Sequence, residues 1–258
     1  MISTVFILLY ILINSSIATC KLEYDNNNCV FISNQIDCEG ELIIPNTTSC
    51  AGNQAFYNTN LRKITFESES KIKIMSNAFQ SSNKLEEIIA PGGFESVGVG
   101  AFKDCISLKT IVGYQNTTVF GKNCFQNCLS LHNFTFNEQM MFDEYAFAGS
   151  GLISIDLTHI QMSISTYFCS NCVNLHYVNL GSNQVINSYA FANCSSLSQV
   201  DTINGLKIVN TSAFMNDPII SIRIADDAEQ LFSCAFSGTK LRNLKLPNKS
   251  IILEDSVF

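Results

Sequence analysis

The sequence predicts a repeat solenoid, mainly β, of about ten coils of 22–23 residues with a parallel β-sheet along one face. The first observation is a phenylalanine that returns every 21 to 23 residues. The second is a set of apolar positions at fixed distances from it. The third is the period-two alternation of segments such as LISIDL (152–157), which is typical of short strands. One coil cannot bury its own apolar face, so stacked coils bury it against one another.

The phenylalanine slot has ten occupants, and alanine precedes seven of them. The occupants are Phe56, Phe79, Phe102, Phe125, Phe147, Phe168, Phe191, Phe214, Phe236 and Phe258. A leucine column follows, and three residues later an isoleucine or valine column begins a Leu-x-x-Ile-x-Leu pattern, which indicates a leucine-rich solenoid. A further apolar column lies five residues before the phenylalanine. We expect the rings to stack as a ladder, because each can bury about 150–250 Å².

A small residue, cysteine or serine, stands between the phenylalanine and the leucine. We expect it to turn inward at a tight corner of the coil. Its cysteine occupants are Cys105, Cys128, Cys172 and Cys194, and its serine occupants are Ser82 and Ser150. Stacked parallel positions aim both Cβ atoms the same way, so these cysteines are expected to be buried free thiols. Cys124 and Cys234 have no obvious partner.

The segments AFKDCISLKTI (101–111) and AFANCSSLSQV (190–200) resemble the BspA-like class of leucine-rich repeats. Its pattern is roughly I-x-x-x-A-F-x-x-C-x-x-L-x-x-I, and the resemblance covers about residues 40–258. It implies a secreted or surface-displayed protein of the kind found in oral bacteria and in protists such as trichomonads. Some members are reported to bind host matrix proteins or to mediate adhesion. No catalytic residues come with the resemblance. Tyr167 in place of alanine, Cys169 directly after Phe168, and MNDPII (215–220) depart from the pattern.

The chain divides into three parts. Residues 1–18 read as a cleaved signal peptide, with the apolar stretch VFILLYILI (5–13) and a cut after Ala18, although a basic n-region is missing. An N-terminal anchor or a core segment is the alternative. Residues 19–50 read as a cap over the first coil, and residues 51–258 as the solenoid, with an incomplete last repeat because no strand follows Phe258. No later segment is apolar enough to span a membrane, so no membrane insertion of the mature chain is expected.

Export would place the cysteines in an oxidising compartment and the sequons within reach of glycosylation. The four cysteines of the cap are candidates for disulfides, and the sequence leaves their three possible pairings open. These are Cys20, Cys29, Cys38 and Cys50. The candidate N-glycosylation sites are Asn46, Asn116, Asn133, Asn210 and Asn248. Asn193 is the weakest sequon, because its neighbours read as buried.

Composition and motifs argue against several functions. The net charge of −7 and the absence of long basic runs exclude a nucleic-acid partner. A single Cys-x-x-Cys, at 169–172, is half a zinc site, so no metal or other cofactor is expected. His132, His159 and His176 read as surface residues, and no catalytic motif is present. The sequence therefore predicts a protein that is not an enzyme.

The outward positions of the predicted strands are the best candidates for binding. The candidate residues are Asp156, Tyr177, Asn179, Asp201, Arg223 and Lys245. Extended solenoid faces commonly bind partners. We therefore expect a secreted or cell-surface interaction protein that adheres to a protein or glycan on host or neighbouring cells. Two alternatives stay open: a solvated face without functional constraint, and a structural or antigenic coat protein without a defined ligand.

Overall fold

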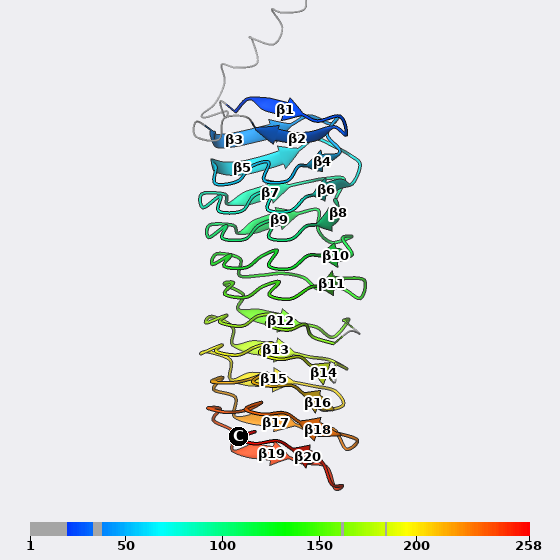
Figure 1. The fold of residues 1–258 in the computed structure, drawn as a ribbon, viewed down its shortest axis with the longest axis vertical. Coiled ribbons are helices and arrows are strands. Elements are labelled where there is room, and N and C mark those ends of the chain that lie inside the picture. The colour runs from blue at the N-terminus through cyan, green and yellow to red at the C-terminus, as the bar shows by residue number, and fades with distance from the viewer. Residues whose placement is uncertain (1–19, 33–37, 161–162, 184) are drawn as a thin grey trace, which may run out of the picture.

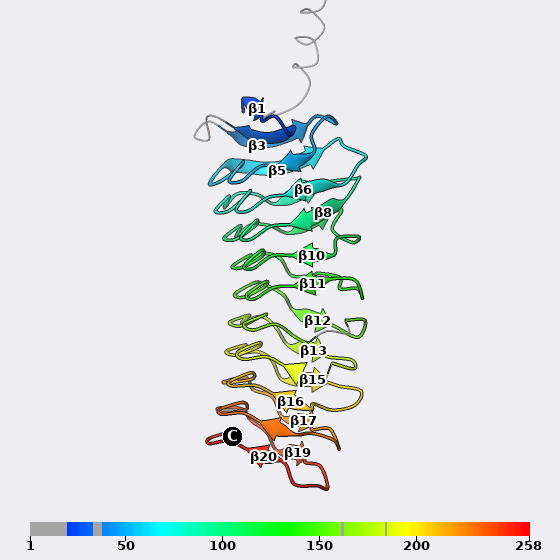
Figure 2. The same ribbon diagram turned by 45° about the vertical axis from the view of Figure 1, so that its right-hand side comes forward.

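The chain winds as a stack of about ten coils, each contacting mainly its neighbours (Figure 1). The computed structural model describes residues 20–32, 38–160, 163–183 and 185–258, so the predicted signal peptide lies outside the described residues. Within these ranges the regular structure is β-strand, with no helix, and therefore none long and apolar enough to cross a membrane. The turned view shows the same regular stack (Figure 2). The predicted β-solenoid is confirmed.

One strip of parallel strands is the sheet that the sequence predicts. Its strands are β3 (Glu39–Ile44), β5 (Asn60–Phe66), β7 (Glu87–Ile89), β9 (Thr110–Val112), β12 (Ser154–Asp156), β13 (Tyr177–Asn179), β15 (Gln199–Asp201), β17 (Ser221–Arg223) and β19 (Asn243–Lys245). The register aligns inward residues, as in the pairs of Ile155 with Val178 and of Val178 with Val200. The strip is interrupted twice, between β9 and β12 and between β15 and β17.

A second strip of strands runs along the stack where the sequence showed only an apolar column. Its strands are β1 (Leu22–Tyr24), β2 (Cys29–Ile32), β4 (Cys50–Ala51), β6 (Ile72–Ile74), β8 (Phe94–Val97), β10 (Val119–Phe120), β11 (Met141–Phe142), β14 (Val185–Ile186), β16 (Ile208–Val209), β18 (Gln230–Leu231) and β20 (Ile252–Leu253). The pairs of Val97 with Phe120 and of Phe120 with Phe142 show that the column is in register between coils. These strands are two to four residues long, too short to show a period-two pattern in the sequence.

The N-terminal end is more regular than a separate cap. β3 and β2 pair in parallel with β5 and β4, so most of residues 29–51 supplies ordinary solenoid strands. β1 alone reverses direction and pairs antiparallel with β2. The four cysteines are paired as Cys20 with Cys38 and Cys29 with Cys50, which settles the pairing that the sequence left open.

The core contains the predicted ladder of rings. From Phe56 to Phe125 the ring centroids lie 5.1–5.4 Å apart and the ring planes are within 7° of parallel. From Phe191 to Phe258 the spacing is 5.5–5.9 Å, within 11° of parallel. Every ring of the ladder before the last is fully buried, whereas Phe258 is 52% exposed. Stacking at this spacing fills the interior of these coils with the same ring.

The ladder breaks at Phe168, and the sequence assignment there is wrong. In regular coils the N–H of the phenylalanine donates to the carbonyl of the residue before the next phenylalanine, as Phe79 does to Ala101. Phe147 N–H donates to the carbonyl of Phe168 itself, and Cys169 N–H donates to Ala190. Cys169 therefore occupies the phenylalanine slot and Phe168 the alanine slot. The Phe168 ring meets Phe147 edge-on, at an interplanar angle of 70°.

The corner cysteines face inward as expected, and three donate from the thiol to a carbonyl of the preceding coil. Cys105 and Cys128 donate to Phe79 and Phe102 over 3.0 and 3.1 Å, and the Ser82 hydroxyl makes the same bond to Phe56 over 2.6 Å. The expectation of a free thiol is wrong for Cys172, which forms a disulfide with Cys169. The register shift causes this, because it turns Cys169 inward beside the corner, with 5.6 Å between the two Cα atoms.

Two aromatic residues, Phe134 and Tyr114, cause the break in the first strip between β9 and β12. Phe134 stands where most coils have isoleucine or valine, and its ring stacks on Tyr114 at a centroid distance of 4.2 Å. The Tyr114 hydroxyl accepts the N–H of Thr135 over 2.9 Å. The Tyr114 hydroxyl oxygen thus accepts the N–H of Thr135, a backbone donor that faces a neighbouring strand in the other coils.

Candidate binding face

The outward side chains of the first strip form one continuous surface, here called the strand face. Four of the six predicted binding residues are exposed on it, and Tyr177 and Asn179 are half-buried. Asp156, Asn179 and Asp201 are register partners on adjacent strands, so they form one column. Tyr177 lies in the neighbouring column, beside Gln199. Arg223 and Lys245 pair on the last two strands of the strip.

At the N-terminal end of the strand face three cations form ion pairs with two glutamates. Lys63 lies 2.7 Å from Glu87, and Arg62 and Lys109 lie 3.2 and 2.8 Å from Glu86. These contacts lower the pKa of the Glu86 carboxyl, with Lys109 the main cause. These three cations are therefore compensated, whereas the exposed Glu39 and Lys84 at this end have no ion-pair partner among the described residues.

In the middle of the strand face the polar groups also bond to one another. The Tyr177 hydroxyl donates to Asp201 over 3.0 Å, and Gln199 donates to the same carboxylate over 3.1 Å. Desolvation, and then the bond to Asp201, raises the pKa of Tyr177. Asp156 accepts from the hydroxyl and N–H of Thr158, which lowers its pKa. These acids are already satisfied by protein donors.

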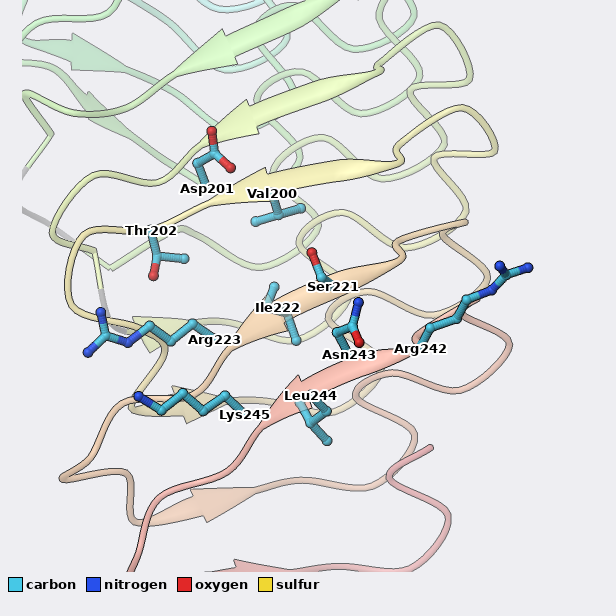
Figure 3. A pocket seen from close by; sticks show the side chains of 10 residues that line it. All are labelled: Val200, Asp201, Thr202, Ser221, Ile222, Arg223, Arg242, Asn243, Leu244 and Lys245. Carbon is cyan, nitrogen blue, oxygen red and sulfur yellow. The ribbon is translucent and has the colours of Figure 1, made fainter.

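The C-terminal end is different, because its cations lack such partners. Arg242 and Lys245 make no ion pair with any described residue, and Arg223 has only Asp226 at 4.0 Å. An open groove of about 610 Å³ lies here across the second break in the strip. It is lined by Val200, Asp201, Thr202, Ser221, Ile222, Arg223, Arg242, Asn243, Leu244 and Lys245. Arg223 and Lys245 lie side by side at one end of their strands and Arg242 at the other (Figure 3).

Pro218 is one cause of this break. At the equivalent position of three other coils, Asn60, Gly151 and Lys240 each donate a backbone N–H to the preceding coil, over 3.0–3.1 Å. Proline has no N–H, so this bond is lost. No backbone hydrogen bond joins residues 198–202 to residues 219–223, both of which the structure describes.

A loop after β15 is the second cause. Thr202 stands where other coils place an inward apolar residue such as Leu157 or Leu180, whose N–H bonds to the next coil. Here the chain bulges through residues 203–205, and Leu206 takes the inward place. The N–H of Leu206 donates to the Arg223 carbonyl over 3.0 Å. Pro218 and the loop at residues 203–205 therefore interrupt the sheet at this place and leave the groove between β15 and β17.

A family model for the BspA type leucine rich repeat region matches residues 30–154, 72–197 and 162–258, in six copies. This chain belongs to the BspA-type leucine-rich repeat family. The comparison with curated proteins found no match.

Two solved structures similar to this BspA-type chain come from bacteria. The pneumococcal vaccine antigen PcpA is 14% identical, over 91% of this chain and 89% of that one, with a TM-score of 0.50. A leucine rich cell surface protein from Faecalibacterium prausnitzii A2-165 is 17% identical, over 92% and 96%, with a TM-score of 0.49. At these identities the likeness to PcpA shows a shared fold.

The sequence missed several features of this BspA-type chain. Arg242, Pro218 and the loop after β15 were not among the candidates, although a proline directly after the corner of a repeat is a visible signal. The buried Asp217 was also missed. It occupies the corner slot and is fully buried; burial raises its pKa to about 9, and one of its oxygens has no partner.

The sequons lie at three kinds of place on the solenoid. Asn46, Asn116 and Asn248 are exposed in the loops that follow β3, β9 and β19. Asn133 is exposed on the strand face itself, one residue before the inward Phe134. Asn210 is half-buried, and its side-chain amide donates to Asn187 over 3.1 Å.

The described residues contain no group of three His, Cys, Asp or Glu side chains that could hold a metal ion. The three histidines are exposed, as the sequence predicts for surface residues. The free cysteines of the core are buried, and Cys234 is half-exposed. What the strand face offers chemically is an open polar surface with one uncompensated basic end.

Proposed function

We propose that this BspA-type repeat protein is exported and acts by binding a macromolecule, a protein or a glycan, on a host or neighbouring cell. The binding site is the strand face, and the interaction serves adhesion. The observation that carries the proposal is the contrast along this face. At its N-terminal end Arg62, Lys63 and Lys109 are paired with acids, whereas Arg242 and Lys245 have no ion-pair partner among the described residues and lie beside an open groove.

This contrast supports binding because the cations clustered at the C-terminal end do not contribute to the stability of the fold. Their presence there is explained if they bind a partner. The cations project from short strands whose inward residues already fill the core. They repel one another, so their clustering is a small cost to the folded state that an acidic partner removes. Exposed solenoid sheets commonly serve as extended binding surfaces.

A coat protein without a defined ligand is the second candidate. The observation that favours it is that ion pairs and hydrogen bonds within the chain satisfy the N-terminal and middle parts of the strand face. Such a protein would be abundant at the surface and would show no saturable partner.

Binding of the purified protein to host cells and to immobilised extracellular matrix proteins tests the proposal. We expect saturable binding that is lost when Arg223, Arg242 and Lys245 are replaced together by glutamine. A matched control replaces Arg62, Lys63 and Lys109 by glutamine, which removes the same charge from the same face. Absence of saturable binding, or equal loss in both variants, would contradict a site at this end of the face.

A further inference from the structure

We propose that the groove between β15 and β17 is a binding site for a sulfated polysaccharide. The inference rests on the proposed function and names the class of ligand at its basic end. Three features of the chain combine there: a break in the sheet, a cluster of cations of which Arg242 and Lys245 have no ion-pair partner among the described residues, and a lining of hydroxyl and amide groups.

The cations have the chemistry that sulfate requires. The guanidinium fork of arginine donates two parallel hydrogen bonds to an oxyanion, and lysine adds a compact charge. Arg223 and Lys245 are register partners on adjacent strands, so both can reach one anionic group. Arg242 lies at the opposite end of β19 (Figure 3). A second sulfate group of the same polysaccharide can therefore reach it.

The cluster is local, in a protein that is acidic overall. The chain carries a net charge of −7, which repels polyanions in general. Lys240 and Lys249 flank the groove residues, and neither has an ion-pair partner among the described residues. From residue 240 to residue 249 the sequence contains four cations and no acid. A polyanion is therefore directed to this end of the strand face.

Asp201 is the one acid in the lining, and it is already engaged. Its carboxylate accepts from Tyr177 on β13, which lies on the side of β15 away from the break, and from Gln199 on β15 itself. These neutral donors hold the carboxylate in place on the middle of the strand face, and no ion pair joins it to Arg223. The groove can admit an anion beside Arg223 without displacing an ion pair to Asp201.

The lining favours a polysaccharide over an acidic peptide. Peptides and proteins gain most of their affinity from a few anchor side chains, chiefly Trp, Tyr and Arg, that fill well-packed pockets. Of the apolar lining residues, Val200 and Ile222 are only 7% and 5% exposed and Leu244 is half-buried, so the groove offers little apolar surface for such an anchor. Ser221, Asn243 and Thr202 instead present polar groups suited to the hydroxyls of a sugar.

Calorimetry with a size-defined heparin oligosaccharide tests the proposal on the full chain. We expect wild-type protein to bind, and the Arg223→Gln/Arg242→Gln/Lys245→Gln variant to lose about tenfold or more in affinity, with a shallower salt dependence. The control variant Arg62→Gln/Lys63→Gln/Lys109→Gln has the same net charge and should bind within about twofold of wild type. Thermal melts verify that both variants are folded.

The proposal would be overturned by no binding of heparin to wild-type protein, by equal weakening in both variants, or by binding of poly-L-glutamate as tight as that of heparin. Desulfated heparin of the same length should bind far more weakly, and equal binding of it would contradict the role of sulfate. Cell binding that depends on the groove but survives enzymatic removal of sulfated polysaccharides would leave the proposed function intact and reject this ligand class.

Discussion

The Asp217 carboxylate accepts the backbone N–H of Cys194 over 2.7 Å inside the corner of the stack. It stands where other coils carry cysteine or serine, and it is fully buried. Its second oxygen has no hydrogen-bond partner. A carboxyl in such a place is favoured in its neutral form, because burial penalises the charge.

The stability of the protein should therefore depend on the protonation of Asp217. Its pKa is about 9 in the folded state, against about 4 for an exposed aspartate. The contribution of Asp217 to the free energy of unfolding is therefore highest below pH 4, where this residue is protonated in both the folded and the unfolded state, and it falls as the pH rises toward 9. The Cys194 thiol, whose pKa is also raised, adds a loss of the same sign at alkaline pH. Asp217→Asn should raise the melting temperature by several degrees at pH 8 and leave it nearly unchanged at pH 4.

Melting curves of both proteins from pH 4 to pH 9 check this prediction. The exposed Asp255→Asn is the control and should follow the wild-type curve throughout. A constant difference between Asp217→Asn and wild type at every pH would contradict it.

Loss of one ring of the ladder should be costly. Phe102 is fully buried and stacks on both Phe79 and Phe125. Phe102→Ala should reduce the free energy of unfolding by about 3–5 kcal/mol, through lost burial and a residual cavity. Phe258→Ala removes a half-exposed ring at the end of the ladder and should cost much less. Chemical denaturation measures both, and similar losses would mean that the ladder is not the main source of core stability.

The free thiols should differ sharply in reactivity. Burial raises the pKa of the Cys105 and Cys124 thiols, so the reactive thiolate is scarce and shielded in both. Cys128 and Cys194 are also buried, whereas Cys234 is half-exposed. We expect a thiol reagent to modify Cys234 alone in native, unreduced protein, and five cysteines after unfolding. A sixth or seventh reactive thiol after unfolding would argue against the disulfide between Cys169 and Cys172.

The loop that shapes the groove should require glycine at position 205. Gly205 has φ +83°, and a Cβ there would lie 2.7 Å from the Ala225 nitrogen. Gly205→Ala should destabilise by about 1–3 kcal/mol and raise hydrogen exchange at Leu206 and Ala225. Asn204→Ala, one residue earlier and exposed, is the control. Equal exchange in both variants would contradict a fixed loop.

If the chain is exported by a eukaryotic cell, the sequons should be used unevenly. The exposed Asn46, Asn116, Asn133 and Asn248 should carry glycans, and the half-buried Asn210 should be the least occupied. Glycopeptide mapping after enzymatic release in labelled water measures occupancy at each site. Full occupancy of Asn210 with none at Asn133 would reverse the expected order.

Much of the fold could be predicted because each coil repeats the same packing problem. Phe56 and Phe236 fill the same space, so the same residue returns at the same interval, and the strands follow from the alternation beside it. Local register was harder. Phe168 matched the phenylalanine slot by identity, but backbone hydrogen bonds place Cys169 there, and identity alone cannot distinguish neighbours one residue apart.

The sequence alone determined the number of coils, the ladder, the first strip of strands and the general line of the outward face. Each of these depends on contacts that repeat with the period of the chain. Only the tertiary structure decided which charges on that face are paired, since Lys63 forms an ion pair with Glu87 of the next coil, whereas Lys245 forms none with any residue that the structure describes. It also revealed the groove. A break in a sheet is a property of two adjacent coils, and here the backbone at Pro218 and Thr202 makes no hydrogen bond between them.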